Sequence, residues 1–489
     1  MQEVLNEEPK IIETDIDAKD GQQKCPKCGA TDISLNVNEG TLRCNFCRYE
    51  FKSEKVQGLE TELTKLEGEI MASGAQDIVE GAEDIVTLKC TSCGAEVVID
   101  TSEVTYARCH WCRNTLTINQ QVPNGAIPDV VLPFKLKKEE ARNFIEGFVN
   151  KRKFFAHPTF KAEFTTENIM GVYFPYMVVD ANSHAYFNGE AEIETKRYTI
   201  DDKTYYDADV YNVEREFDLT IEGLTVESSE DKLNKKAKDK TTNIINSIMP
   251  FDVENSVKWN SNYLKGYSSE KRDTNIDELR PLVDAQVKDI ARFAANKSMP
   301  QYDRGARWYN QQVDVKGKQW KSAYLPVWLY SYQQVKDNGE KLLHYVAVNA
   351  RTKETMGSVP IHNSKLLAVS AIIELIAIFT GTTVAYAGDF DDGPVTFGVL
   401  LCLSGFAFWA SMKAKYRNKA ARHYHETETK TSMFNLRKID QFREKRKKLR
   451  NSQIEGANNR TVNGTFSEGI KGTGLEKFAN DIIDMNNWK

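Results

Sequence analysis

Histidine is scarce in this chain, and its seven copies are scattered, with one close pair at His423 and His425. The sequence has no His-Glu-x-x-His metal motif, no Gly-x4-Gly-Lys-Ser/Thr phosphate loop and no recognisable nucleophile motif. The absence of these motifs lowers the expectation of catalysis. We therefore expect a protein that works by binding and not as an enzyme.

A secretory signal and an excess of positive charge are also missing. Residues 1–20 have neither a basic start nor an apolar run, so we expect the cysteines to face a reducing compartment. The formal net charge is −5 and the pI is near 6.0. This balance gives no overall signature of nucleic-acid binding.

Cysteine is uncommon, yet eight of the nine copies fall into two repeats of Cys-x2-Cys-x15-Cys-x2-Cys. The repeats consist of Cys25, Cys28, Cys44 and Cys47, and of Cys90, Cys93, Cys109 and Cys112. Four thiolates at this spacing are typical of a zinc ribbon that is closed to substrate. The sequence predicts two structural zinc ions, and the alternatives are disulfides or a redox dithiol. A zinc- or redox-responsive switch is a further hypothesis.

Two apolar segments near the C-terminus predict a transmembrane hairpin. Residues 366–387 carry one acidic residue, Glu374, and as a helix would be roughly 33 Å long. Residues 395–412 form a shorter candidate, and a basic flank follows them. The positive-inside rule then predicts a multi-pass protein of the cell membrane with both termini and the ribbons in the cytosol. Glu374 is either a functional acid or a protonated side chain against the second helix.

The basic flank is the one strongly positive part of the chain. Residues 413–450 contain fourteen lysines or arginines and four acids. Leu436, Ile439 and Phe442 recur at steps of three, which predicts an amphipathic helix lying on anionic lipid. Nucleic acid is the alternative partner of this segment.

The region between the ribbons and the membrane contains an internal repeat. Residues 171–180 resemble residues 322–331, and each segment precedes an Asn-Gly pair, Asn188-Gly189 or Asn338-Gly339, that predicts a hairpin turn. Upstream of each segment is a second similarity, between residues 131–134 and residues 248–251. Helices are predicted at 138–151 and 276–297, the second beginning near Pro281. The sequence therefore predicts two related α+β units with antiparallel sheets.

The predicted organisation is multi-domain α+β. Its parts are a disordered acidic N-terminus (1–23), ribbon 1 (24–52), an acidic helical linker (53–88), ribbon 2 (89–120), α+β unit 1 (128–227), a charged helical connector (228–247), α+β unit 2 (248–363), the two membrane helices (366–387 and 395–412), the basic segment (413–450) and a mostly disordered tail (451–489).

The order of two four-cysteine ribbons, a Leu-Pro-Phe strand, Val-Tyr-Phe-Pro and Tyr-Leu-Pro-Val-Trp strands and an apolar C-terminal region resembles bacterial TFIIB-type zinc ribbon-containing membrane proteins. The resemblance covers residues 24–412 and implies only the eight cysteine ligands. It names a ribbon and no activity.

The net charge of the two ribbons favours protein binding over nucleic-acid binding. Once loaded with zinc, ribbon 1 is close to neutral and ribbon 2 is negative, so both lack the charge that phosphate contacts require. Phe46, His110 and Trp111 could stack on a base or a partner, although packing beside the metal is the simpler expectation. We expect an adaptor that holds a protein partner at the inner membrane face. A membrane-tethered nucleic-acid or transcription-related factor is the alternative.

Overall fold

In the computed structural model, most of the region between residues 128 and 387 is described, together with separate segments before and after it. The described residues are 9–14, 25–30, 32–37, 39–52, 56, 59, 62–77, 85–89, 96–100, 106–108, 115–117, 128–200, 203–228, 248–259, 261–264, 266–270, 272, 274–335, 341–387, 401, 403–416 and 429–450.

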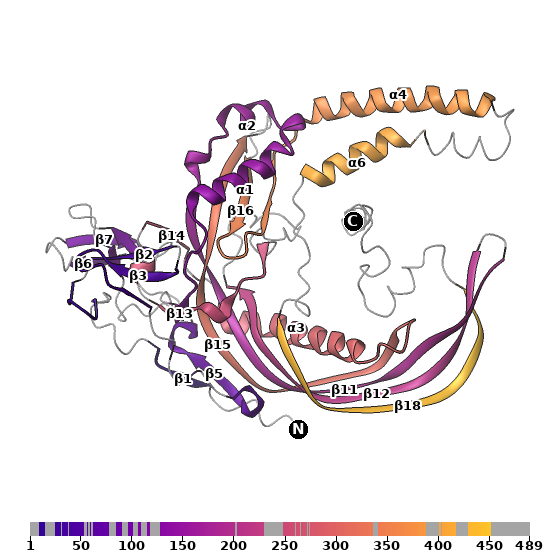
Figure 1. The fold of residues 1–489 in the computed structure, drawn as a ribbon, viewed down its shortest axis with the longest axis horizontal. Helices are drawn as coiled ribbons and strands as arrows, with labels where there is room; N and C mark the ends of the chain where they lie inside the picture. The colour runs from indigo at the N-terminus through magenta and orange to yellow at the C-terminus, as the bar shows by residue number, and fades with distance from the viewer. Residues whose placement is uncertain are drawn as a thin grey trace.

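An 11-stranded mixed sheet dominates the molecule. Its main path is β1 (Lys10–Ile12), β5 (Gly68–Ala72), β15 (Ala306–Val335), β11 (Met170–Ile200), β12 (Lys203–Glu227) and β18 (Lys430–Arg450). The shorter members are β10 (Val130–Val131), β13 (Val257–Lys258), β14 (Ser268–Ser269), β16 (Lys341–Asn349) and β17 (Thr355–Gly357). The strands β11, β12 and β18 run together as a long curved arm (Figure 1). With 31 residues, β11 alone is roughly 100 Å long.

The predicted fold class was wrong in its proportions and in its sheets. Strands, not balanced α+β units, make up the largest share of the described structure, and the two repeats share one sheet. That sheet is not purely antiparallel, because β1 with β5, β5 with β15, β10 with β15 and β14 with β11 are parallel pairs. The predicted disordered N-terminus is also wrong where β1 pairs with β5.

The two repeated segments pair with each other about a local pseudo-two-fold axis. Their antiparallel register joins Tyr173 to Pro326, Phe174 to Leu325 and Pro175 to Tyr324. Equivalent positions of the repeat therefore exchange partners across the axis. The side chains of Tyr173 and Tyr324 are buried in one core cluster, and those of Phe174 and Leu325 in another. Both faces of the sheet are covered at this point.

The same symmetry relates the parallel short strands. The strand β10 pairs with β15 at Ala323 and Tyr324, whereas β14 pairs with β11 at the equivalent positions, Val172 and Tyr173. Each short strand ends seven positions before a helix, α1 (Lys138–Asn150) or α3 (Ile276–Lys297). The strand equivalent to β10 in the second repeat is therefore β14. Residues 248–251, which resemble residues 131–134 in sequence, do not occupy that position.

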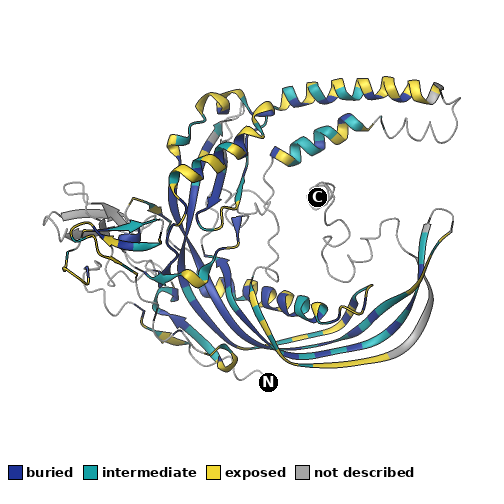
Figure 2. Ribbon diagram, in the orientation of Figure 1, coloured by how far each residue is buried: buried dark blue, intermediate teal, exposed yellow. Residues whose placement is uncertain are grey.

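Helices cover the sheet on both sides of the axis. The helix α1 packs with α2 (Pro158–Glu163) against the first core cluster, while α3 lies on the concave side of the long arm (Figures 1 and 2). The predicted start of the second helix near Pro281 was wrong. The helix begins at Ile276 because the side chain of Glu278 accepts a hydrogen bond from the N–H of Asn275 at 3.3 Å.

One of the two predicted Asn-Gly turns is a β-bulge. The pair Asn188-Gly189 lies inside β11, where the register with β15 shifts. A Cβ atom on Gly189 would lie 2.1 Å from the carbonyl oxygen of Arg307, so the glycine allows a close backbone approach and no turn. The chain reverses instead between Ile200 and Lys203. The pair Asn338-Gly339 lies outside the described residues, but β15 and β16 pair on either side of it.

The predicted amphipathic helix in the basic segment is the strand β18. It pairs with β12 from Glu222 to Tyr205, with register shifts at three places. Successive side chains of a strand point to opposite faces, so residues three apart lie on opposite faces of the sheet. Leu436 packs in the core beside α3, whereas the side chain of Ile439 is 46% exposed. Steps of three therefore do not give this segment one continuous apolar face.

The described part of the predicted helical linker is extended chain with short 3-10 turns, η2 (Leu63–Lys65) and η3 (Ser73–Ala75), and the strand β5. Buried amide side chains of the sheet hold its backbone. Gln319 Nε2 donates to the carbonyl of Leu59 at 2.6 Å, and Asn182 Nδ2 donates to that of Leu66 at 3.1 Å. A helix would use such carbonyls internally, so tertiary hydrogen bonds outweigh the helical periodicity.

The predicted transmembrane hairpin is not found. Of the described helices, one is long and apolar enough to cross a membrane, α4 (Asn363–Ala387), over residues Asn363–Val384. Its companion α6 (Ser404–Tyr416) has 13 residues, and residues 395–400 of the second predicted span lie outside the described chain. Figure 2 shows that α4 is largely exposed. The predicted helical connector, apart from Ser228, and the predicted disordered tail also lie outside the described residues.

Candidate metal centre

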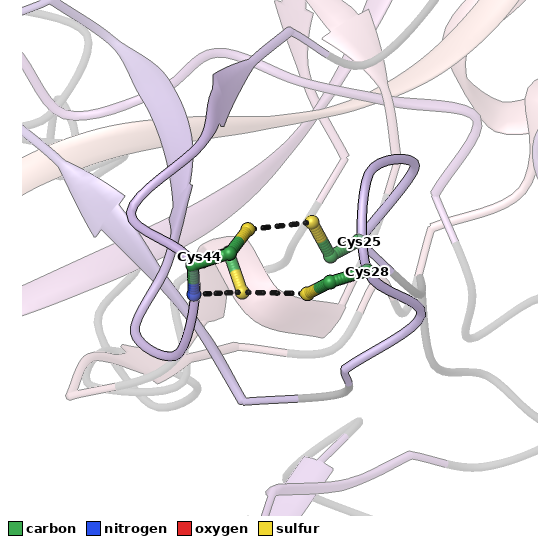
Figure 3. A group of neighbouring side chains, drawn as sticks. Cys25, Cys28 and Cys44 are labelled. Carbon is green, nitrogen blue, oxygen red and sulfur yellow. Dashed lines mark hydrogen bonds between the residues drawn. The ribbon is translucent and has the colours of Figure 1, made fainter.

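The four cysteines of ribbon 1 come together at the end of a small antiparallel sheet. This sheet has the order β2 (Ile33–Asn36), β3 (Thr41–Cys44) and β4 (Glu50–Phe51). All four sulfur atoms lie within 4.8 Å of one another. The sulfurs of Cys25 and Cys47 are 3.6 Å apart, as are those of Cys28 and Cys44. Figure 3 shows the labelled side chains pointing toward one another.

Backbone hydrogen bonds shape the two Cys-x-x-Cys turns alike. The N–H of Gly29 donates to the carbonyl of Cys25 at 2.8 Å, and the N–H of Arg48 donates to that of Cys44 at 2.9 Å. Both donors have a left-handed backbone, with φ of 73° at Gly29 and 60° at Arg48. Glycine adopts this conformation without strain, whereas arginine does so at a cost. The matched turns bring the two cysteine pairs face to face.

The environment of Cys25 favours its thiolate. Burial raises the pKa of this thiol, but hydrogen bonds from the backbone amides of Cys28 and Lys27 and from neighbouring sulfurs outweigh burial and lower the pKa to about 7. A thiolate is the form that binds a metal. Burial, together with the same contacts between sulfurs, raises the pKa of the neighbouring Cys28 to about 12, so without a metal the cluster favours one thiolate beside a protonated thiol.

The donor set and its spacing fit a tetrahedral ion. Bonds of about 2.3 Å from zinc to four sulfurs imply sulfur separations of about 3.8 Å, close to the 3.6 Å separations at this site. Cys25 and Cys44 are buried, and Cys28 is exposed. The four cysteines could thus hold one metal ion with no ligand position left for a substrate.

Ribbon 1 is packed into the body of the protein. Ile33 and Leu42 are fully buried in the same core cluster as Phe134 and Tyr173. The opposite end of the ribbon is not covered, because the side chain of Phe46, in the second Cys-x-x-Cys turn, is 81% exposed. The expectation that Phe46 packs beside the metal was wrong.

The cysteines of ribbon 2, Cys90, Cys93, Cys109 and Cys112, lie outside the described residues, as do His110 and Trp111. The strands around them are described. Lys89 pairs with Glu96 where β6 (Ile85–Lys89) meets β7 (Glu96–Asp100), and Arg108 pairs with Thr115 where β8 (Tyr106–Arg108) meets β9 (Thr115–Thr117). Each strand pair therefore brackets one Cys-x-x-Cys segment.

A cleft of about 640 Å³ separates ribbon 1 from the start of α1. We call it the ribbon cleft. Its ribbon wall includes residues 34–37, Arg43 and Arg48, and its other wall includes Lys137, Lys138, Glu139, Tyr267 and Trp328. The cleft lies directly against the metal site, because Cys44 also lines it.

The structure gives Glu374 a partner. Its Oε2 accepts a hydrogen bond from the N–H of Gly405 at 2.7 Å, at the first turn of α6. The aromatic side chains of the two repeated segments, Tyr173, Tyr176, Tyr324, Trp328 and Tyr330, are all buried.

Sequence reasoning missed a buried acid that connects the N-terminal strands to the sheet. Asp129 accepts hydrogen bonds from Thr14 Oγ1 at 2.5 Å, from the N–H of Gly74 at 2.7 Å and from the N–H of Ser322 at 2.8 Å. Burial raises the pKa of Asp129 to about 6, although these hydrogen bonds and Arg272 oppose the shift. No local motif marks such a residue, because its partners are distant in sequence.

No protein-family model matches the sequence, and no solved structure matches it. A protein of Bacillus subtilis (strain 168), "Uncharacterized protein YdjG", is 23% identical over 350 residues. The match covers 71% of this chain and 92% of that protein. The chain is similar to YdjG over most of its length. Membership of the TFIIB-type zinc ribbon group stays a prediction.

Proposed function

We propose that this protein is a membrane-associated zinc-ribbon adaptor that binds a protein partner at the cytosolic face of a membrane. Zinc is the proposed ion, one in each ribbon, because four cysteine thiolates favour it and leave no position for catalysis. The proposed membrane anchor is α4, whose exposed side chains include Leu367, Leu375 and Phe379. A cytosolic location would keep the thiols reduced.

The main support for this proposal is the exposed tip of ribbon 1, the second Cys-x-x-Cys turn with Phe46. Its base is fixed in the core through Ile33 and Leu42, so the position of the tip is set by the body. The side chain of Phe46 is nevertheless held away from that core. A large aromatic residue on a rigid support is the type of side chain that anchors protein interfaces.

The basic residues of the last strand, β18, have a different role in this proposal from the lipid-bound helix that the sequence predicted. The backbone of β18 is paired with β12, so a lipid-bound helix is not proposed. Within this proposal, the basic side chains of the strand contact anionic lipid.

The test is crosslinking in cells that express the full chain, followed by membrane extraction and capture with and without nuclease. Phe46→Ala is the main variant, because it removes the exposed ring and keeps all metal ligands. Cys402→Ser is the control, since Cys402 belongs to neither repeat. Proteins that co-purify despite nuclease and are lost in Phe46→Ala support the adaptor. If nucleic acid is captured directly and the proteins depend on it, a tethered nucleic-acid factor replaces this proposal.

A further inference from the structure

The ribbon cleft has cations on both of its walls. Arg43 and Arg48 come from ribbon 1, and Lys137 and Lys138 come from the N-terminal end of α1. The one acidic residue that lines it is Glu139. Within the described part of the chain, the ion pair nearest the cleft joins Arg43 to Glu50 at 3.8 Å, and both side chains are substantially exposed. Arg48 and Lys137 line the cleft, and neither forms an ion pair with an acidic side chain of the described residues.

One wall of the cleft is also the edge of a sheet. The strand β2 is the outer strand of the order β2-β3-β4, and among the described residues it pairs with β3 alone. Residues 34–37 of this edge line the cleft. An outer strand presents backbone N–H and C=O groups that can pair with an added strand.

The other features of the cleft favour a peptide over a nucleic acid. The indole of Trp328 is 6% exposed, and its N–H donates to the carbonyl of Leu136 at 2.8 Å. It therefore offers little ring face for a base to stack on. A zinc ion with four thiolates would add two negative charges beside Cys44, which oppose any anion there and oppose a run of consecutive phosphates more than a segment whose acidic residues are separated by neutral ones.

We propose that the ribbon cleft binds an extended acidic segment of the partner protein. The segment pairs with the β2 edge, and its carboxylates lie between Arg48 on one wall and Lys137 on the other. This inference rests on the proposed adaptor function and adds the chemistry of the partner. Phe46 would contact the same partner outside the cleft.

The direct test uses a fluorescein-labelled ten-residue peptide of alternating Glu and Val, titrated against the zinc-loaded full chain in detergent micelles. We expect the peptide to bind and a Lys-Val peptide of equal length not to bind. Reversal of two charges, Arg48→Glu with Lys137→Glu, should weaken binding by about tenfold or more. The control Lys288→Glu reverses an exposed charge on α3, outside the cleft, and should leave binding unchanged.

A second peptide tests the β2 edge. A Glu-Val peptide that is N-methylated at two consecutive central residues keeps the charge but removes a backbone N–H from each edge of the strand, so it should bind at least several-fold more weakly than the unmodified Glu-Val peptide. Equal binding of the two would overturn edge pairing. Equal binding by the wild-type chain and the double variant would overturn the cleft as the site. Displacement of the peptide by a lower concentration of ten-residue oligo-dT would assign the cleft to nucleic acid instead.

The cell experiment separates this inference from the proposed function. Partners that remain with the double variant but are lost with Phe46→Ala would keep the adaptor and remove the cleft. If the wild-type chain captures no protein, the adaptor is removed, and the peptide titration still decides whether the cleft binds acidic segments.

Discussion

Single residues hold the distant segments of this chain together. Asp129 joins residue 14, the turn at Gly74 and the long strand β15. Arg272 donates to the carbonyls of Ala75 and Gln76 from a buried position. Removing one member of such a group leaves the remaining buried polar atoms without partners, which costs more than the hydrogen bond alone. Substitution of these residues should therefore lower the free energy of unfolding more than substitution elsewhere.

Metal content is the first prediction at this scale. Cys44→Ser should lower the zinc content of the purified chain by about one ion per molecule, because a neutral hydroxyl is a poor replacement for a thiolate. Mass spectrometry of the metals measures the loss. Cys402→Ser should retain the wild-type content, and equal content in Cys44→Ser and Cys402→Ser would show that ribbon 1 holds no metal.

Stability should depend on pH through Asp129. Burial raises its pKa from 3.8 to about 6 in the folded state, so its contribution is full below about pH 4 and is lost as the pH rises through 6. The shift corresponds to about 3 kcal/mol. In Asp129→Asn, the free energy of unfolding should change less between pH 4 and 7 than in the wild type, as followed by denaturant titration. Parallel pH curves for the two proteins would remove Asp129 as the cause.

Asp218 provides an internal check because its shift has the opposite sign. Hydrogen bonds from Lys316 and then from His184 lower the pKa of its carboxyl. Its contribution is present above the ordinary aspartate pKa and is lost as the pH falls below it. The two aspartates therefore act in different pH windows.

At the scale of elements, the last strand is fixed by a buried charge. Arg215 on β12 is fully buried and donates to Asp440 of β18 at 2.9 Å and to Ser298, after α3, at 3.2 Å. One side chain therefore joins the edge strand and the end of the helix. The strand and α3 are expected to loosen together when this link is broken.

Asp440→Ala tests the link. It leaves Arg215 buried without its carboxylate and should lower the free energy of unfolding by about 3 kcal/mol. Arg437→Ala is the matched control on the same strand, because it breaks a pair with Glu216 of the same 2.9 Å length in which the arginine side chain is 71% exposed. That loss should be below about 1 kcal/mol. Similar losses in the two variants would argue against a special role for Arg215.

The crossing of α4 and α6 depends on the lack of a side chain at Gly405. A Cβ atom there would lie 2.5 Å from the carbonyl oxygen of Ser370 and 2.7 Å from Cβ of Glu374. Gly405→Val should therefore separate the helices and cost about 2 kcal/mol in thermal or detergent unfolding. Ala407→Val introduces the same side chain at an exposed position of α6 and should be nearly neutral. A neutral Gly405→Val would mean that the close contact is not maintained.

The elements that the sequence predicts well are those with local signals. The helix α1 and the strands beside the Asn338-Gly339 pair follow from periodicity and turn chemistry. The linker, the Asn188-Gly189 pair and β18 were predicted wrongly, because their conformations depend on partners far along the chain. For the metal site, spacing was enough to select Cys25, Cys28, Cys44 and Cys47. Nothing in that spacing indicated the ribbon cleft, which forms only when ribbon 1 packs beside α1.

At the scale of the whole molecule, α4 extends from the body (Figure 1). Its large apolar side chains, including Leu375 and Phe379, are exposed. If α4 is the anchor, Leu375→Lys with Phe379→Lys should release the chain from membranes washed with alkaline carbonate, since each lysine near the bilayer centre costs about 3 kcal/mol. Leu282→Lys alters an exposed apolar residue of α3 and should stay with the membrane. Retention of the double variant would exclude α4 as the anchor.

The exchange of partners between the two repeats has a consequence for synthesis. Tyr173 pairs with Pro326, which the ribosome adds 153 residues later. At about 5–20 residues per second, this delay is roughly 8 to 30 s. During that time the nascent β11 has no native neighbour on the side where β15 will lie. The first repeat therefore cannot complete its fold as it emerges, and this interval is when the chain would be most open to aggregation or to a chaperone.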